Sequence, residues 1–226
     1  MCKNNLLPDR FSRIDETNRS QHYYLSDEHS CLYLGEYFSR ESYSASPTNQ
    51  LVLNFKISPE KLCDTPGRIV HKGRAIAEVA RALSCATRSS ALERYTWIPL
   101  PPSKIVGHAG YDDRGTRVLA AAFNGRGADI RSILKQTEST EGDHARANRL
   151  SYEELCAITT IDSTQLALGP VRERIVLFDD VLTSGKHFKC GVETLRAAGL
   201  TQPIVGVFIA RSVRRDAAVE FDNLDT

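Results

Sequence analysis

The feature that most constrains this chain is a near-continuous apolar run at residues 174–181 that carries an Asp-Asp pair near its end. Runs of this kind are typical of strands buried on both faces in a parallel sheet. Apolar residues then recur at helical spacing over 188–195, and Gly199 is placed to end that helix. A second apolar strand follows at 204–210. Strand, helix and strand in this order form a βαβ unit with a right-handed crossover. The sequence therefore predicts an α/β fold with a parallel sheet.

Shorter patterns predict further elements upstream. Apolar residues at helical spacing predict an amphipathic helix over 74–86. The run at 95–100 (YTWIPL) predicts a strand, which the prolines around its end stop because they cannot continue a central ladder. Asp112 or Asp113 can cap a helix that runs to about Phe123. The remaining predictions are a strand at 51–56, a partly helical segment around 129–136 and a strand at 155–161.

Composition and charge are those of an ordinary globular protein. The 226 residues are 41% hydrophobic, and 29 basic against 28 acidic residues leave a formal net charge of +1. This balance gives no general attraction to nucleic acid or to an anionic membrane. The longest apolar runs, at 118–123 and 204–210, fall short of the roughly 20 residues that a membrane helix needs. The first ten residues also lack the apolar run of a secretory signal.

The cysteines bear on the compartment. Six are spread along the chain without a CxxC pair: Cys2, Cys31, Cys63, Cys85, Cys156 and Cys190. This spacing favours reduced, mostly buried thiols over a disulfide framework or a metal site. We therefore expect a cytoplasmic protein.

We expect the chain to consist of an N-terminal extension, residues 1–68, and a core, residues 69–226. The first 25 residues are polar and poorly patterned, so we expect a loose terminus. Residues 125–149 are polar and glycine-bearing, and we expect part of them to form a mobile loop over the site. Their charged residues His144, Arg146 and Arg149 either close over a ligand or form a solvated cluster.

The Asp179–Asp180 pair and the loop after it carry the chemistry. Ligands of open α/β sheets bind beyond the carboxyl ends of the strands. The small residues Ser184 and Gly185 at a helix N-terminus let backbone N–H groups and the helix dipole approach an anion, and Lys186 adds a charge. Two carboxylates about a ribose-width from that anion can accept hydrogen bonds from vicinal hydroxyls. This arrangement predicts a site for ribose 5-phosphate; the alternative is an acidic strand end with a solvated loop.

A Walker A loop is a poorer interpretation of Gly185-Lys186. The motif needs Ser or Thr at the next position, where this chain has His187. It also needs a glycine five residues before Gly185, and none is there.

Residues 175–187 (IVLFDDVLTSGKH) resemble the phosphoribosyl pyrophosphate (PRPP) signature of type I phosphoribosyltransferases: four apolar, two acidic and two apolar residues, then a Thr/Ser-Gly loop. Residues 97–104 (WIPLPPSK) are similar to the first core strand and pyrophosphate loop of that family. The closing strand at 204–211 (IVGVFIAR) looks most like the ComF-type, amidophosphoribosyltransferase-like branch. The resemblance covers about 70–212 and implies a parallel-sheet core that binds PRPP with Mg²⁺.

The resemblance also implies a role for each matching residue. Asp179 and Asp180 would hold the ribose hydroxyls, directly or through Mg²⁺ and water. The 5-phosphate would lie in a cradle formed by Thr183, Ser184, Gly185, Lys186 and His187. Ser103 and Lys104 would face the pyrophosphate, and Arg211 would lie near the acceptor pocket. Arg114 or Arg117 could also reach the pyrophosphate, or else belong to a solvated helix N-terminus.

Two positions depart from the family pattern. His187 stands where the family usually has Ser or Thr; a histidine can donate to phosphate or point away from it. Thr183 stands where 6-oxopurine enzymes of this fold carry Asp, which argues against hypoxanthine or guanine as acceptor.

Three functions stay open at the level of sequence. The first is a phosphoribosyltransferase acting on a nitrogen acceptor. The second is a sensor or regulatory subunit that binds PRPP or a nucleotide without turnover, as the ComF-like resemblance allows. The third is a nucleotide-cleaving protein, for which Asp112 or Asp113 is the candidate carboxylate. The expected ligand is a small phosphoribosyl compound, and a homo-oligomer or a partner protein is compatible with all three.

Overall fold

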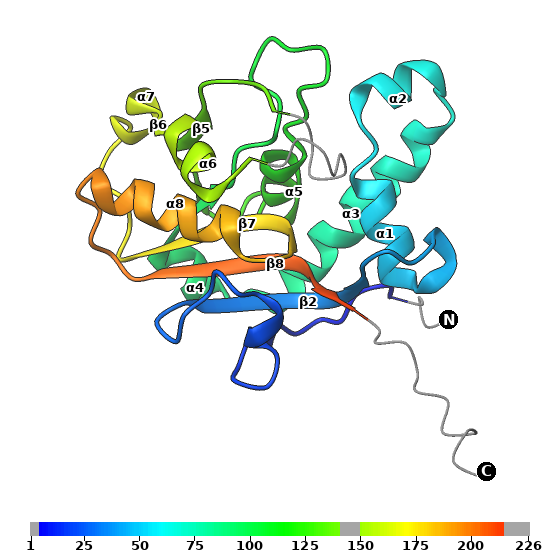
Figure 1. Cartoon of the computed structure of the whole chain (residues 1–226), viewed down its shortest axis with the longest axis horizontal. Helices are drawn as coiled ribbons and strands as arrows, with labels where there is room; N and C mark the ends of the chain where they lie inside the picture. Colours follow the sequence, from blue (N-terminus) through cyan, green and yellow to red (C-terminus); the bar gives the residue numbers. More distant parts are fainter. Residues whose placement is uncertain (1–4, 141–149, 215–226) are drawn as a thin grey trace, which may run out of the picture.

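The computed structural model describes residues 5–140 and 150–214. Its centre is a six-stranded sheet in the order β1-β2-β8-β7-β3-β4 (Figure 1). The strands are β1 (Ser12–Arg13), β2 (Ser30–Phe38), β3 (Tyr95–Pro99), β4 (Asp129–Ile130), β7 (Arg174–Leu182) and β8 (Ile204–Val213). All neighbours pair in parallel except β1 and β2, which are antiparallel. A separate antiparallel pair joins β5 (Leu134–Gln136) to β6 (Thr159–Ile161).

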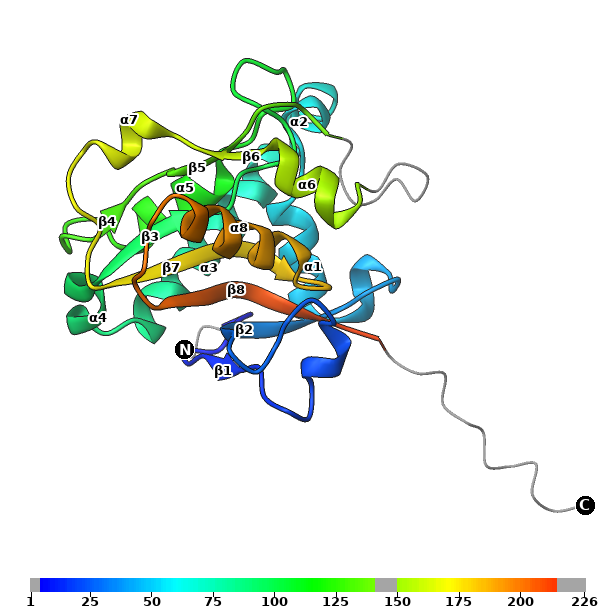
Figure 2. The same ribbon diagram turned by 60° about the vertical axis from the view of Figure 1, so that its left-hand side comes forward.

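Helices cover both faces of the sheet (Figure 2). They are α1 (Pro47–Phe55), α2 (Pro59–Asp64), α3 (Arg68–Ala86), α4 (Ser89–Arg94), α5 (Arg114–Ala122), α6 (Tyr152–Ile158), α7 (Ser163–Leu166) and α8 (Lys186–Ala197). Within the described ranges, none of these helices is both long and apolar enough to cross a membrane.

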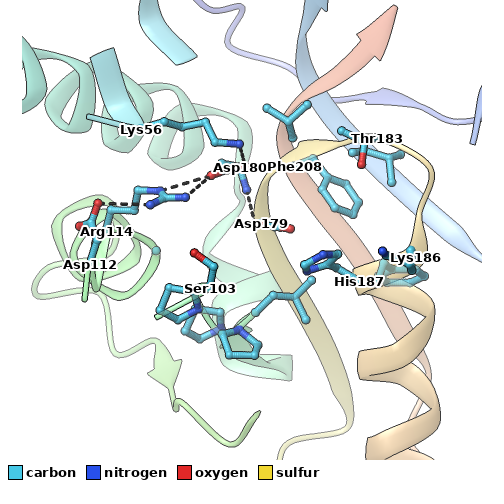
Figure 3. Close-up of a pocket in the computed structure, with 18 of the residues that line it drawn as sticks. Lys56, Ser103, Asp112, Arg114, Asp179, Asp180, Thr183, Lys186, His187 and Phe208 are labelled. Atoms are coloured by element: carbon cyan, nitrogen blue, oxygen red, sulfur yellow. Dashed lines mark hydrogen bonds and ion pairs between the residues drawn. The ribbon is translucent and has the colours of Figure 1, made fainter. Parts of the chain in front are cut away.

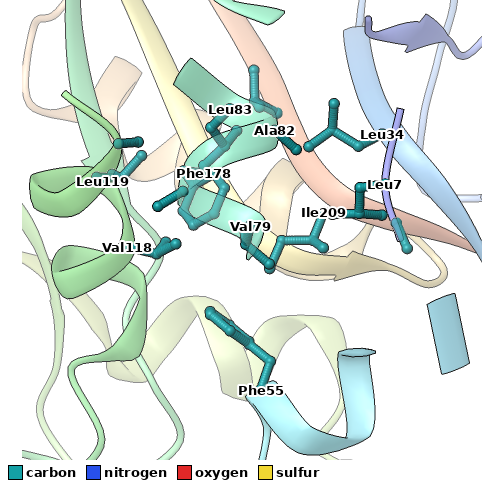
Figure 4. Close-up of a cluster of buried hydrophobic side chains, with 14 of the residues drawn as sticks. Leu7, Leu34, Phe55, Val79, Ala82, Leu83, Val118, Leu119, Phe178 and Ile209 are labelled. Atoms are coloured by element: carbon teal, nitrogen blue, oxygen red, sulfur yellow. The ribbon is translucent and has the colours of Figure 1, made fainter. Parts of the chain in front are cut away.

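Successive side chains of β7 point to opposite faces of the sheet and pack into two different hydrophobic cores. Val176 and Phe178 pack with residues of α1, α3 and α5, whereas Ile175 and Leu177 pack with residues of α8. Figure 4 shows Phe178 at the centre of the first core. Full burial of a side chain of this size contributes about 1.5–3 kcal/mol. Because both faces of β7 are buried, the residues at its end are held in fixed positions.

The α8 helix lies close against the sheet because of one glycine. A Cβ atom at Gly191 would lie 2.9 Å from Leu100 Cδ2 and 3.2 Å from Leu177 Cδ1. Any larger residue would push the helix away from β7. The close approach therefore fixes where the N-terminus of α8 meets the end of β7.

The topology places a switch point between β3 and β7. The chain leaves β3 through α5 toward β4 on one side, and leaves β7 through α8 toward β8 on the other. The order β4-β3-β7-β8 is the 2-1-3-4 order of a common class of doubly wound sheets. Such sheets bind ligands beyond the carboxyl ends of the strands at the switch point. The α/β class with a parallel sheet, the helix over 74–86, and the elements β3, α5, β7, α8 and β8 are confirmed.

The strand predicted at 51–56 is wrong, because this segment is the end of α1. Ser46 caps the helix by accepting a hydrogen bond from the Asn49 N–H, and Pro47 occupies its first turn. Leu51 and Phe55 are buried on one face of this helix. A short apolar run reads equally well as strand or helix, and here the capping signal decides.

Two predictions between β3 and β7 are also wrong. Residues 129–136 form β4 and β5 rather than a helix, since β4 pairs with β3 and Arg131 N–H donates to the Trp97 carbonyl. The strand predicted at 155–161 is confirmed only for β6. Its first half belongs to α6, which begins at a capping box of Ser151 and Glu154.

The first 25 residues are not a loose terminus. Leu7, Ile14, His22 and Leu25 are buried, and β1 pairs with β2. β2 in turn lies beside β8, so residues from the first 68 positions share one core with the later strands.

Asn49 joins α1 to the end of β2. Its Oδ1 accepts from the Phe38 N–H at 2.9 Å, and its Nδ2 donates to the Phe38 carbonyl at 3.0 Å. Asn49→Ala removes both bonds from a fully buried position and should lower the free energy of unfolding by about 1–3 kcal/mol. Chemical denaturation measures this. Asn54→Ala on the same helix, which removes one exposed bond to Tyr43, should cost no more than about 0.5 kcal/mol. Equal losses in the two variants would contradict the assignment.

Candidate functional site

A cleft of about 1750 Å³ opens beyond the carboxyl ends of β3 and β7. Residues from distant parts of the chain border it. The predicted site residues that line it are Ser103, Lys104, Arg114, Asp179, Asp180, Thr183, Ser184, Gly185, Lys186 and His187. The structure therefore brings these residues together at the switch point, whereas Arg117 and Arg211 do not line the cleft.

Asp180 is tied to two cations at the cleft wall (Figure 3). Its Oδ1 lies 3.0 Å from Lys56 Nζ, and its Oδ2 lies 2.6 Å from Arg114 Nη2. Burial alone would raise the pKa of this carboxyl, but Lys56 and Arg114 hold it below its ordinary value. Asp180 is therefore a buried carboxylate that stays ionised because it has two partners.

The ion pairs continue along the cleft wall to Asp112. Its carboxylate binds Lys72 Nζ in a fully buried pair, Arg114 Nη1 at 3.2 Å and Arg117 Nη2 at 2.9 Å. With three cations around it, Asp112 anchors the start of α5 and is not placed to activate a water molecule. Its neighbour Asp113 forms an ion pair with Arg117 at 2.8 Å.

Asp179 has a different environment from its neighbour. Successive residues of a strand point to opposite faces, so Asp179 faces the side of α8. Its Oδ1 accepts from the Asp180 N–H at 2.7 Å. Burial and the nearby Asp180 charge raise the pKa of Asp179 to about 7. The pair thus consists of one carboxylate held by cations and one that has no cation against it among the described residues.

The turn after β7 has the geometry of an anion site. Gly185 adopts φ +85° as the N-cap residue of α8, in the left-handed region that favours glycine. A Cβ atom there would also lie 2.8 Å from Leu25 Cδ2. The twelve-residue α8 begins directly after it, and the N–H groups of its first turn have no partners within the helix. These groups lie where the cleft meets the helix N-terminus.

Two residues of the predicted cradle behave differently. Lys186 Nζ donates to the Leu150 carbonyl at 2.7 Å, so its charge is directed across the rim of the cleft. His187 lines the cleft, and Figure 3 shows its imidazole pointing toward the space below Asp179. The sequence left open which way His187 points, and in the structure it lines the cleft.

The loop after β3 forms the opposite wall. Leu100 N–H donates to the Phe178 carbonyl at 2.8 Å, which fastens the start of this loop to β7. The Ser103 carbonyl accepts from Thr140 N–H at 2.7 Å. In Figure 3 the Ser103 hydroxyl points toward the space that Asp179 and His187 border. Lys104 lines the same wall. The predicted cluster His144, Arg146 and Arg149 lies outside the described residues.

Arg211, expected from the resemblance to lie near the acceptor, does not line the cleft. It lies opposite Glu36 in the pairing of β2 with β8, and its Nη2 is 2.6 Å from Glu36 Oε1. Its Nη1 donates to Gln21 Oε1 at 3.0 Å. Glu36 belongs to β2 and Gln21 to the segment before it, and the sequence predicted neither of them beside β8.

Several cleft residues were missed by the sequence. Lys56 was read as part of a strand, although the Ser46-Pro47 capping signal would have placed it directly after a helix. Tyr23, Tyr24 and Tyr37 line the cleft from a segment read as an extension. No local pattern marks these tyrosines, because only the pairing of β2 with β8 brings them to the site.

The donor set bears on magnesium. Among the described residues, no three His, Cys, Asp or Glu side chains form a group that could hold a metal ion. Mg²⁺ often keeps several waters and binds through one or two carboxylates together with ligand phosphates. Asp179 fits that arrangement, with a phosphate-bearing ligand supplying the remaining oxygens.

Comparison with known proteins gave no assignment. No family model matches the chain, and no curated protein matches its sequence.

The contrast between the two aspartates predicts an unusual pH dependence of stability. The folded-state pKa of Asp179 is raised to about 7, above its unfolded value near 4. Its contribution to stability is therefore complete below about pH 4 and is lost as pH rises through about 7. The free energy of unfolding of Asp179→Asn, measured relative to wild type, should therefore rise by about 2–3 kcal/mol as the pH increases from 5 to 8.

Denaturation of both proteins in chelator at several pH values measures this gain. Asp180→Asn is the matched control: it leaves Lys56 and Arg114 without their carboxylate and should be less stable than wild type at every pH tested. A difference between Asp179→Asn and wild type that does not change with pH would rule out the raised pKa.

Proposed function

We propose that the cleft binds the ribose 5-phosphate group of PRPP and that the protein transfers this group to a nitrogen acceptor, releasing pyrophosphate. One observation carries the proposal: Asp179, the Gly185 turn and the N-terminus of α8 meet in one cleft at the β3/β7 switch point. The resemblance of residues 175–187 to the PRPP signature of type I phosphoribosyltransferases points to the same ligand.

Each part of the ligand has a chemically suitable counterpart. The left-handed turn at Gly185 and the first turn of α8 offer backbone N–H groups and a positive dipole end to the 5-phosphate. Asp179 offers carboxylate oxygens to the ribose hydroxyls. Lys56, Lys104 and Arg114 line the cleft and offer positive charge to the pyrophosphate. Mg²⁺ carried by the ligand would neutralise charge on the pyrophosphate as it leaves.

In the proposed reaction, the bond from the anomeric carbon to the pyrophosphate oxygen breaks and a bond from that carbon to the acceptor nitrogen forms. The pyrophosphate leaves with the electron pair, and the acceptor nitrogen gives up a proton. The transition state carries positive charge on the ribose ring, so the nearby carboxylates would stabilise it electrostatically. The protein's part is position and charge complementarity rather than covalent catalysis. Thr183 favours an acceptor other than a 6-oxopurine.

A non-catalytic PRPP or nucleotide sensor is the second candidate, and one observation favours it. Arg114 is held by both Asp180 and Asp112, so leaving-group stabilisation would require it to exchange partners. A module that only binds ligand has no such requirement. Nucleotide cleavage is less well supported, because the carboxylate of Asp112 is surrounded by cations.

Titration with PRPP, with and without Mg²⁺, tests the proposal directly. Calorimetry reports binding, and a pyrophosphate assay on the same samples with a panel of bases and amines reports turnover. We expect Mg²⁺-dependent binding and release that depends on one acceptor. Binding without release would identify a sensor, and release with water alone would identify a hydrolase. No binding of PRPP or of ribose 5-phosphate would refute the site.

Asp179 should be decisive for affinity. Asp179→Asn keeps the size of the side chain and an acceptor for the Asp180 N–H but removes the negative charge. It should weaken PRPP binding roughly 10- to 100-fold, the cost of losing hydrogen bonds to a charged group. Glu41→Gln, the same charge change at an exposed residue of the cleft rim, should leave affinity unchanged. Replacing Asp179 and Asp180 together by Asn should abolish PRPP binding.

A further inference from the structure

The turn that would hold the phosphate is itself held by residues 22–25, of which Tyr23 and Tyr24 line the cleft and His22 and Leu25 do not. His22 is fully buried, and its Nδ1 forms a short hydrogen bond with the Thr183 carbonyl. Tyr24 N–H donates to the Ser184 carbonyl at 2.9 Å. Two successive carbonyls of the turn therefore point toward the N-terminal segment.

These two hydrogen bonds also determine where the N–H group of each of the same peptide units points. The peptide bonds of the described residues are all trans. In a planar trans peptide, the C=O of one residue and the N–H of the next point in opposite directions. With the Thr183 and Ser184 carbonyls directed outward, the N–H groups of Ser184 and Gly185 must point away from the N-terminal segment. Ser184 and Gly185 line the cleft on that side.

The surroundings of His22 fix its chemical form. A carbonyl can only accept, so the ring must carry its proton on Nδ1. Nε2 is buried and has no hydrogen-bond partner among the described residues. A charged ring would place an unpaired cationic N–H there, and burial lowers the pKa of His22 accordingly. The ring is therefore neutral, and its N–H group on Nδ1 donates to the Thr183 carbonyl.

Hydrogen-bonded turns hold the segment that carries His22. His22 N–H donates to the Arg19 carbonyl at 2.8 Å, and Leu25 N–H donates to the His22 carbonyl at 2.8 Å. Leu25 then packs on Gly185 so closely that no Cβ atom fits between them. Residues 22–25 therefore supply both the hydrogen-bond donors and the packing residue that hold the turn, on the side to which its carbonyls point.

We infer that His22 is a positioning residue of the phosphate site: it holds the Thr183 carbonyl outward and thereby aims the Ser184 N–H at the ligand. This inference rests on the proposed function, because the ligand group is the 5-phosphate. His22 does not line the cleft and does not touch the ligand. Its effect is on binding of the phosphate end alone.

Two substitutions separate the donor from the volume of the ring. His22→Phe keeps a buried ring but has no donor for the Thr183 carbonyl. His22→Asn keeps an N–H donor near the position of Nδ1. Ribose 5-phosphate and Mg²⁺–pyrophosphate serve as probes in calorimetry on the full chain, since only the first uses the turn. We expect His22→Phe to weaken ribose 5-phosphate binding roughly 10-fold, His22→Asn to restore most of it, and pyrophosphate affinity to stay unchanged in both.

Several results would overturn the inference. They are unchanged ribose 5-phosphate affinity in His22→Phe, or an equal loss for both probes, which would indicate a general structural role. Nitrogen-15 NMR of the wild-type protein provides a test that does not depend on any variant folding: a proton on Nε2 instead of Nδ1 would contradict the hydrogen bond. Failure of wild type to bind ribose 5-phosphate would refute the proposed function, and with it this role, and that outcome is recognisable without any variant.

Discussion

The interaction on which the site depends is the pairing of Asp180 with Lys56 and Arg114. A buried carboxylate is costly unless cations compensate it, and here the cations come from the end of α1 and the start of α5. These two helices lie on the same face of the sheet and meet at the end of β7. The charge on one strand thus holds two helices in place around the cleft. Asp179, on the other face of β7, has no cation against it among residues 5–140 and 150–214.

The last 40 residues of the sheet were predictable because their signals are local and redundant. In the βαβ unit from β7 to β8, the apolar strand, the Gly185 turn and the helix period all agree, so β7, α8 and β8 appear where the sequence predicts them. The candidate site followed from the same segment, since its residues are contiguous. The loop after β3 could be added because parallel strands bring their carboxyl ends to one edge.

The remainder depends on contacts between distant residues. Lys56 reaches Asp180 only because α1 is a helix, and six apolar-rich residues do not distinguish helix from strand. The resemblance alone implies an acceptor-side role for Arg211, and the sequence shows no strand beyond β8. β2 lies beyond it and supplies Glu36 as the partner of Arg211. His22 has no pattern around it at all, and its role depends on a carbonyl that lies 161 positions away.

The parallel pairing of β2 with β8 has a consequence for how the protein is made. β2 leaves the ribosome well before β8, because more than 160 residues separate the two strands. Contacts of such long sequence separation form late and slow folding, because the loop that they close costs entropy before they repay it. During synthesis β2 must wait without its parallel partner, although β1 can already pair with its other edge. The sheet beside the cleft is therefore completed in a late step of folding, when β2 docks beside β8.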